Sequence, residues 1–253
     1  MTRVAIIGGT GLNSIDGIEP HDTANLAANL AANLQTPYGM ASAPLGKRRW
    51  SKHDVLFLAR HGQPHQIAPH RINYRANLWL LQQQGVDFVI ATNAVGGITA
   101  HCTPGTIVLP DQLIDYSWGR EHSYADDQQL RHVEFGSPYD AGLRGTLIAA
   151  AAQLSQDLVV SGTYGCTQGP RLETAAEIDR MERDGCDLVG MTGMPEAGLA
   201  RELGMPYVAL CLVVNEAAGR GVGPIDEGDI GRVSRAGMGA IVTLLDSFFE
   251  LLE

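Results

Sequence analysis

The stretch DFVIATNAVGG, residues 87–97, begins as an apolar, β-branched run and ends in small and polar residues. Such a run is typical of a strand that is buried on both faces of a sheet. Similar runs occupy residues 3–9, 54–60, 106–110, 158–165, 187–193 and 207–215. Helical patterns lie between them, at residues 73–85, 139–154, 173–185, 195–204 and about 227–251. This alternation predicts an α/β fold with a largely parallel sheet covered by helices on both faces.

The composition narrows the classes of partner. The chain of 253 residues carries a formal net charge of −10, which argues against nucleic acid and anionic membrane surfaces. No run of about 18 apolar residues occurs, and the start lacks a long apolar segment, so we expect neither a membrane span nor a signal peptide. The four cysteines have no C-x-x-C spacing. This favours reduced thiols in a cytoplasmic protein and argues against a metal site.

Polar and small residues gather where the predicted strands end, and in such sheets ligands bind beyond the carboxyl ends of the strands. The first strand runs into VAIIGGTGL, residues 4–12, a Gly-rich turn of the kind that binds phosphate through backbone N–H groups. Ser14 stands where a dinucleotide fingerprint needs its third glycine, so that class is disfavoured. Arg60 and His61 follow another strand and favour anion binding, because an unpaired buried charge is costly.

Two later strand ends add neutral groups. Thr192 offers a hydroxyl and a backbone N–H, while Met191 is either core or a face for a flat apolar ligand. Asn215 ends the most apolar run, where its amide needs hydrogen-bond partners. No H-E-x-x-H or G-x-S-x-G motif occurs. The strand ends therefore indicate a site for an anion and a neutral polar ring, without an evident protein nucleophile.

The stretch GPRLETAAE, residues 169–177, leaves two interpretations of Glu173 open. A helical pattern follows it, and a carboxylate in the first turn of a helix is favoured by the helix dipole. Alternatively, the Glu173 carboxylate contacts and recognises a bound ligand.

The blocks IIGGTGL, TPYG, ARHG, NYRAN, TNAVGG, GPRLETAAE, GMTGMPEAGLA and VVN, in this order, resemble the trimeric nucleoside phosphorylases, in the branch that acts on 5′-methylthio nucleosides. The resemblance runs nearly end to end and implies a single-domain nucleoside phosphorylase fold over residues 1–253, with a twisted, mostly parallel mixed sheet. Residues 21–35, rich in Ala and Leu, are longer than the family pattern and are interpreted as a local insertion. A homotrimer, or a hexamer of two trimers, is also implied.

The resemblance assigns roles residue by residue. Inorganic phosphate, a co-substrate, would be held by Thr10, Arg60, His61, Ala94 (through its backbone N–H) and Thr192. The nucleoside would contact Met191, Asn215, Glu216, Ala217 and Glu173. His61 and Asn215 are the expected catalytic residues, His132 is a candidate for approaching the neighbouring subunit's site, and no cofactor or metal is implied.

The implied activity is that of a pentosyltransferase in purine salvage. Phosphate attacks C1′ of the nucleoside and releases a free purine and a 5-substituted ribose 1-phosphate. Positive charge develops on the sugar, as in glycoside hydrolysis, and the attacking phosphate supplies the negative charge. A nucleosidase that uses water, and a binding protein without turnover, remain as alternatives.

Glu173 and Asn215 also indicate the base. Relatives that use methylthioadenosine place a small hydroxyl residue and an aspartate at these positions, whereas those that use 6-oxopurines have this pair. An ionised glutamate accepts the N1 hydrogen of hypoxanthine, and an amide donates to O6. Relatives that prefer a 5′-hydroxyl carry a histidine near the start of the last helix, whereas no histidine follows His132 here. The resemblance therefore implies an apolar 5′ pocket, with Val222 and Ile225 as its candidate residues. The expected substrate is S-methyl-5′-thioinosine, with S-methyl-5′-thioadenosine or general 6-oxopurine nucleosides as alternatives.

Overall fold

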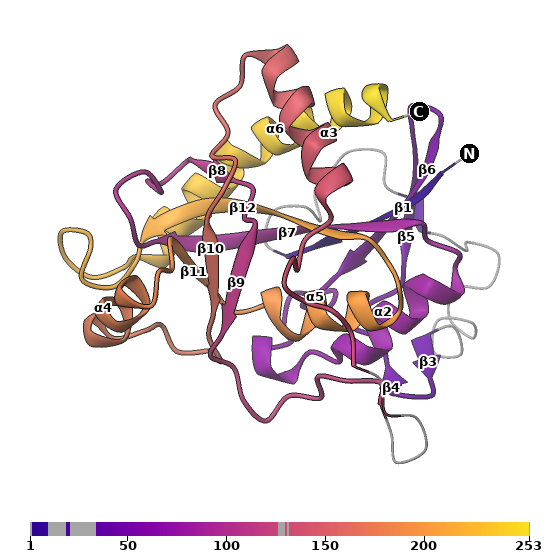
Figure 1. Ribbon diagram of the computed structural model, residues 1–253, viewed down its shortest axis with the longest axis horizontal. Coiled ribbons are helices and arrows are strands. Elements are labelled where there is room, and N and C mark those ends of the chain that lie inside the picture. The colour runs from indigo at the N-terminus through magenta and orange to yellow at the C-terminus, as the bar shows by residue number, and fades with distance from the viewer. Residues whose placement is uncertain (1, 10–18, 21–33, 126–129, 131, 253) are drawn as a thin grey trace.

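The computed structural model describes residues 2–9, 19–20, 34–125, 130 and 132–252. A ten-stranded sheet forms the centre of the described chain, with helices on both faces (Figure 1). Its main path runs in the order β2 (Glu19–Pro20), β5 (Gly46–Trp50), β6 (His53–Ala59), β1 (Arg3–Gly8), β7 (Phe88–Gly97), β11 (Leu188–Gly190), β10 (Thr163–Cys166) and β9 (Gln112–Asp115). Off this path, β12 (Tyr207–Glu216) pairs with β7 and with β8 (Ile107–Val108). A separate small hairpin joins β3 (Gln35–Thr36) and β4 (Gly39–Met40).

The long strand β7 organises the sheet. It runs parallel to β1 and β12, whereas its last two residues pair antiparallel with β11. The strands β11, β10 and β9 are parallel to one another. The sheet is therefore mixed but mostly parallel, as predicted, and β11 approaches β7 from the opposite direction to β1.

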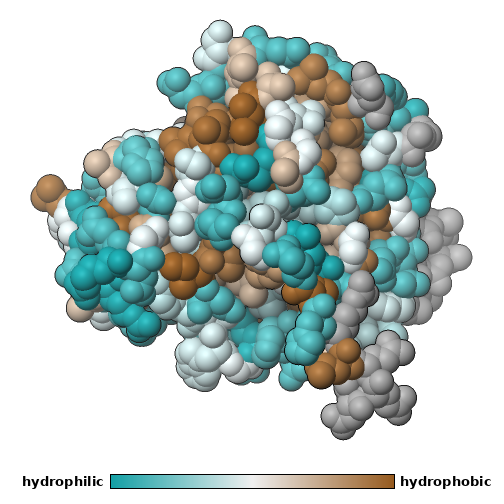
Figure 2. All heavy atoms as spheres, viewed as in Figure 1, coloured by the Kyte–Doolittle hydropathy of each residue, from teal (hydrophilic) through white to brown (hydrophobic). Residues whose placement is uncertain are grey.

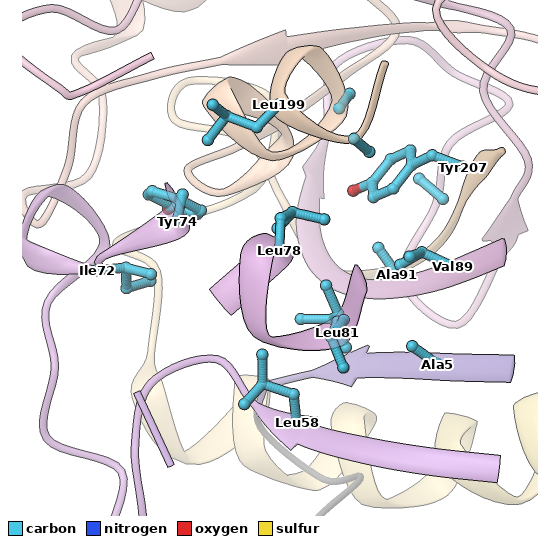
Figure 3. Close-up of a cluster of buried hydrophobic side chains, with 14 of the residues drawn as sticks. Ala5, Leu58, Ile72, Tyr74, Leu78, Leu81, Val89, Ala91, Leu199 and Tyr207 are labelled. Atoms are coloured by element: carbon cyan, nitrogen blue, oxygen red, sulfur yellow. The ribbon is translucent and has the colours of Figure 1, made fainter. Parts of the chain in front are cut away.

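Two apolar layers hold the helices against the sheet. Helices α2 (Tyr74–Gln83) and α5 (Gly193–Glu202) cover one face, and α3 (Ala141–Leu154) and α6 (Glu227–Leu251) cover the other. In Figure 3, Leu78 and Leu81 of α2 lie against Leu58, Val89 and Ala91 of the strands. Removing such side chains from water is the main favourable term in folding.

A third, smaller apolar cluster holds α4 (Ala175–Arg183) and is centred on Ile178, Met181 and Val189. The outer side of α4 is hydrophilic, whereas hydrophobic residues gather near the top of the same view, over α3 (Figure 2). A short 3-10 helix, η2 (Pro69–Arg71), precedes α2.

Local sequence signals explain where the helices begin. Asn73 and Asp140 cap α2 and α3 by accepting a backbone N–H from the first turn. Thr174 and Glu177 form a capping box at the start of α4. Because Thr174 is the cap, Glu173 lies before the helix. The interpretation of Glu173 as a charge in the first turn is therefore wrong.

The five predicted helices are confirmed, but the strand predictions need corrections. The predicted strand at 158–165 is wrong over most of its length: β10 begins only at Thr163, and Val159 makes an isolated bridge with Val108. The strands β5 and β9 were missed because GKRRW and QLID lack a continuous apolar run. Of the predicted insertion at 21–35, only the last two positions lie within the described residues.

None of the described helices combines the length and apolarity needed to cross a membrane. All four cysteines are buried and free.

The close approach of backbones at Gly97 predicts a sensitive position. A Cβ at Gly97 would lie 1.7 Å from the carbonyl oxygen of Cys102, so Gly97→Ala should lower the free energy of unfolding by at least about 1–3 kcal/mol. Gly145 in α3 has no neighbour within 4 Å of a built Cβ, and Gly145→Ala should raise that free energy by roughly 0.5–1 kcal/mol. Urea unfolding of both variants measures the two changes, and equal stabilities would contradict the assigned packing.

Candidate functional site

Three strand ends meet beside the middle of β7. The strands β1 and β6 end together at Gly8 and Ala59, and β1 pairs with β7 only as far as Ala91. From the other side, β11 runs back along β7 from Gly97. The segment from Thr92 to Val95 is therefore bounded by facing carboxyl ends, and a cavity of about 380 Å³ opens there.

Most of the sequence-predicted site residues line this one cavity. They are Arg60, His61, Ala94, Glu173, Met191, Thr192, Asn215, Ala217 and Ile225. Thr10 lies outside the described residues. Glu216, His132 and Val222 are exposed and do not line the cavity. Within a single chain, the Glu216 side chain therefore lies outside the site. The backbone carbonyl of Glu216 accepts a hydrogen bond from the Asn215 side chain at 2.7 Å.

Arg60 forms a buried ion pair with Glu196. Its Nε and Nη2 atoms donate to the two Glu196 oxygens at 2.7 and 2.8 Å, and the two side chains are 1% and 0% exposed. Tyr207 donates its hydroxyl to the same carboxylate at 2.9 Å. Burial opposes the charge on Arg60, but interactions led by the Glu196 carboxylate outweigh it and raise the pKa of Arg60. The anion that Arg60 needs is therefore supplied by Glu196, which the sequence pattern did not reveal.

The Arg60 guanidinium nevertheless keeps one donor for the cavity. Nη1 donates one hydrogen to the carbonyl of Thr92 at 3.0 Å. Among the residues that the structure describes, its second hydrogen has no acceptor. A Cβ built on Gly9 would lie 3.9 Å from this nitrogen and 3.6 Å from His61 Nε2, so both nitrogens flank the same space.

His61 is a neutral ring held in one tautomer. Its Nδ1 lies 2.8 Å from the carbonyl oxygen of Ile67. A carbonyl oxygen only accepts, so Nδ1 carries the hydrogen and Nε2 is an acceptor. Burial lowers the pKa of His61 to about 4, and His65 stacks on the ring with centroids 4.4 Å apart.

Thr192 and Asn93 form a second polar pair in the cavity wall. Asn93 donates its amide hydrogen to Thr192 Oγ1 at 2.8 Å, which leaves the hydroxyl hydrogen of Thr192 to donate elsewhere. Asn93 Oδ1 is buried and has no partner among the described residues. Sequence reasoning missed Asn93, although an amide inside the apolar run ATNAVGG was a usable signal.

Glu173 is held by Thr167, a residue that the sequence analysis did not identify. Thr167 donates its hydroxyl to Glu173 Oε1 at 2.5 Å. The other carboxylate oxygen remains to accept a hydrogen from a ligand. Asn215 uses one of its two amide hydrogens on the Glu216 carbonyl, so one amide hydrogen and its oxygen remain for a ligand.

Buried Arg120 fixes the loops that carry these residues. Its guanidinium donates to the carbonyls of Thr167 and Gln168 at 3.0 and 2.9 Å. It also donates to the carbonyls of Met191 and Met194 at 2.9 and 2.5 Å. Arg120 therefore ties the segment before Glu173 to the segment around Met191.

The remaining wall of the cavity is apolar and comes from β12, α6 and the loop that joins them. It contains Leu212, Val214, Ile225, Ile230, Met238 and Ile241. Ser234 lies among them, and its buried hydroxyl has no partner in the described part of the chain. The α6 members recur about every four residues, a helical stripe that the sequence contained. Within the described residues, no cluster of His, Cys, Asp and Glu side chains suited to a metal ion occurs.

Comparison with known proteins shows the family of this chain. The family model described as the phosphorylase superfamily matches residues 3–250. The chain belongs to the phosphorylase superfamily. This phosphorylase is 48% identical over 247 residues, 97% of each chain, to a protein of Pseudomonas syringae named probable S-methyl-5′-thioinosine phosphorylase.

More distant relatives share the fold and differ in name. The 6-oxopurine nucleoside phosphorylase of Pyrococcus furiosus is 42% identical over 226 residues, covering 87% of this chain and 81% of that one. The crystal structure of methylthioadenosine phosphorylase from Schistosoma mansoni in complex with adenine superposes with a TM-score of 0.86. It is 27% identical, and the match covers 99% of this phosphorylase and 92% of that chain.

The buried ion pair generates a stability prediction. Glu196→Leu leaves Arg60 as an unpaired buried charge and should lower the free energy of unfolding by about 3–5 kcal/mol. The double variant Arg60→Met, Glu196→Leu removes both charges and should be more stable than Glu196→Leu alone. Denaturant unfolding of the full cycle measures the coupling, and losses that simply add would contradict the pair. Tyr207→Phe, which removes only a hydrogen bond, should cost about 1 kcal/mol.

Proposed function

We propose that this phosphorylase cleaves S-methyl-5′-thioinosine with inorganic phosphate, giving hypoxanthine and 5-methylthioribose 1-phosphate. The observation that carries the proposal is that Glu173 and Asn215 line the same cavity as Arg60 and His61. The name of the Pseudomonas syringae relative supports it. The phosphorolysis of S-methyl-5′-thioadenosine, or of 6-oxopurine nucleosides in general, is the alternative that the other relatives suggest.

Recognition of the base follows from the free atoms of Glu173 and Asn215. With Oε1 of Glu173 bonded to Thr167, Oε2 accepts the N1 hydrogen of hypoxanthine. The free Asn215 amide hydrogen goes to O6 or N7 of the purine. Adenine presents a lone pair at N1 and an amino group at C6, so the same two side chains would face it with unmatched atoms.

Catalysis then consists of positioning and charge stabilisation. Arg60 Nη1, the Thr192 hydroxyl and His61 Nε2 contact the phosphate, and the Ala94 backbone N–H and Thr10 are proposed to complete the site. Phosphate attacks C1′ as the glycosidic bond breaks, and its negative charge stabilises the positive charge on the sugar. Asn215 stabilises the leaving purine by donating as negative charge builds on it. No metal and no cofactor take part in this scheme.

The apolar wall formed by β12, α6 and the loop between them accommodates the 5′ end of the nucleoside. Ile225 and Met238 offer carbon and sulfur surface to a methylthio group, which has no hydrogen-bond requirement. A 5′-hydroxyl placed there would lose its hydrogen bonds to water, apart from any made to Ser234.

We further propose that the protein works as a homotrimer, alone or paired into a hexamer, in the cytoplasm. Apolar side chains at the surface support subunit contacts: Trp118 is 72%, Leu130 78% and Leu172 46% exposed. Leu172 also lines the cavity, so a neighbouring subunit seated there would help to close the site. Light scattering after gel filtration measures the assembly.

The base-recognition proposal predicts substrate preference. In competition, the wild type should favour methylthioinosine over methylthioadenosine by about 10²–10⁴-fold in kcat/KM, because the adenine nucleoside leaves buried groups unpaired. The double variant Glu173→Ser, Asn215→Asp should shift the ratio toward the adenine nucleoside. Release of base must also depend on phosphate, since release without it would indicate a hydrolase. A wild type that prefers methylthioadenosine would refute the assigned roles.

The apolar wall predicts a second preference. Methylthioinosine should be cleaved with a kcat/KM at least about 10-fold above that of inosine, since a buried methyl-sized apolar contact is worth roughly 1–3 kcal/mol. Ile225→Ser should narrow this ratio without changing the preference for the base. Equal efficiencies on the two nucleosides in the wild type would show that the 5′ group lies elsewhere.

A further inference from the structure

The hydrogen-bonding state of His61 limits which anions fit beside it. Nδ1 is committed as a donor to the Ile67 carbonyl at 2.8 Å. The neutral ring therefore presents a lone pair at Nε2, and this nitrogen lies next to the space at Gly9 that Arg60 Nη1 also flanks. An anion in that space meets a donor from Arg60 and an acceptor from His61, and the Thr192 hydroxyl lines the same cavity.

The charge around this space is balanced. Arg60 is the one Arg or Lys among the described residues that line the cavity, and Glu196 neutralises it through two short hydrogen bonds. General attraction between an anion and a cationic pocket is therefore weak here. Selection must depend on matching each donor with an acceptor, because an unmatched pair of buried groups is costly.

We propose that the anion site selects an oxyanion that carries its own hydrogen. Hydrogen phosphate donates its P–O–H to His61 Nε2, while its remaining oxygens accept hydrogens from Arg60 Nη1 and from the Thr192 hydroxyl. Sulfate has the same shape but no hydrogen at neutral pH, so its oxygens face the Nε2 lone pair unless His61 takes up a proton. This inference rests on the proposed function, which places phosphate in this cavity.

The surroundings of His61 oppose that proton uptake. Desolvation of the partly buried ring lowers the pKa of His61 to about 4. The neighbouring Arg60, and His65, which stacks on the ring, also oppose a positive charge there. The Ile67 carbonyl favours the protonated ring, but it accepts the Nδ1 hydrogen in the neutral ring as well. Phosphate should thus bind without a proton from solvent above neutral pH, whereas sulfate should bind together with one.

Isothermal titration calorimetry of the full-length protein with phosphate and with sulfate tests this directly. Repeating each titration in two buffers of different ionisation enthalpy gives the number of protons taken up. Between about pH 7.5 and 8.5 we expect no uptake with phosphate and about one proton with sulfate. Sulfate affinity should fall about tenfold over that one pH unit, and phosphate should bind at least about tenfold more tightly than sulfate at the upper pH.

Two variants sharpen the result. His61→Gln places an amide donor at this position, so sulfate should no longer need a proton, and the preference for phosphate should shrink toward unity. His101→Gln changes an exposed histidine that does not line the cavity and should keep the wild-type preference. Unchanged selectivity in His61→Gln would contradict the inference.

The number of protons that the wild type takes up on binding each anion tests the inference even if a variant fails to fold. Sulfate that binds as tightly as phosphate at about pH 8.5, without proton uptake, would overturn the inference. So would a protein that binds neither anion. Phosphate-dependent release of hypoxanthine, measured separately on the wild type, distinguishes these failures from a failure of the proposed function.

Discussion

The guanidinium of Arg60 connects four segments that are distant in the chain. It extends from the end of β6, pairs with Glu196 of α5, and donates to the carbonyl of Thr92 in β7. A longer contact of 3.5 Å reaches the Ile7 carbonyl of β1. Through Glu196 the network extends to Tyr207 at the start of β12. Arg60 therefore holds the ends of β6 and β1 against β7 and α5 at this side of the cavity.

A buried ion pair of this kind adds little to the free energy of unfolding, but it fixes the orientation of the side chains that form it. Taking both charges out of water is costly, and a well-packed apolar pair of the same volume is often as stable. The ion pair, however, fixes the direction of every Arg60 hydrogen, so that one Nη1 hydrogen faces the cavity. A substrate then meets donors already in place, and little reorganisation is needed when charge develops during the reaction. Arg120 orients the opposite wall in the same way, mainly through backbone carbonyls and also through the Gln168 side chain and the Tyr74 hydroxyl.

Much of the fold could be predicted from the apolar runs and from the helical patterns between them. The alternation of strands and helices, and the strand ends at His61, Thr192 and Asn215, were visible because burial imposes a pattern on neighbouring residues. Glu196 was not visible, since a glutamate near the start of a helix is ordinary and only the packing of α5 shows that it is buried. The direction of β11 was equally hidden, because an apolar run of strand length has no sign that distinguishes parallel from antiparallel pairing.

The location of the site was easier to predict than the state of its groups. The polar strand ends converge as expected, yet the sequence left the charge on Arg60 in need of an external anion. It also gave no indication that Thr167 would occupy one oxygen of Glu173. These are contacts between residues far apart in the chain, or across a turn, and they depend on side-chain placement at the level of one hydrogen bond.

The reversed approach of β11 also sets the dimensions of the site. Because carboxyl ends face each other across Thr92 to Val95, the distance between the proposed anion site and the proposed base site is set by a few residues of one continuous strand. Backbone hydrogen bonds to β12 hold those residues at a fixed rise per residue. A continuous strand therefore fixes this distance, which a loop of variable length would not do. Exchanging side chains at either end of this segment would leave the distance between the two proposed sites unchanged, whereas an insertion within Thr92 to Val95 would increase it.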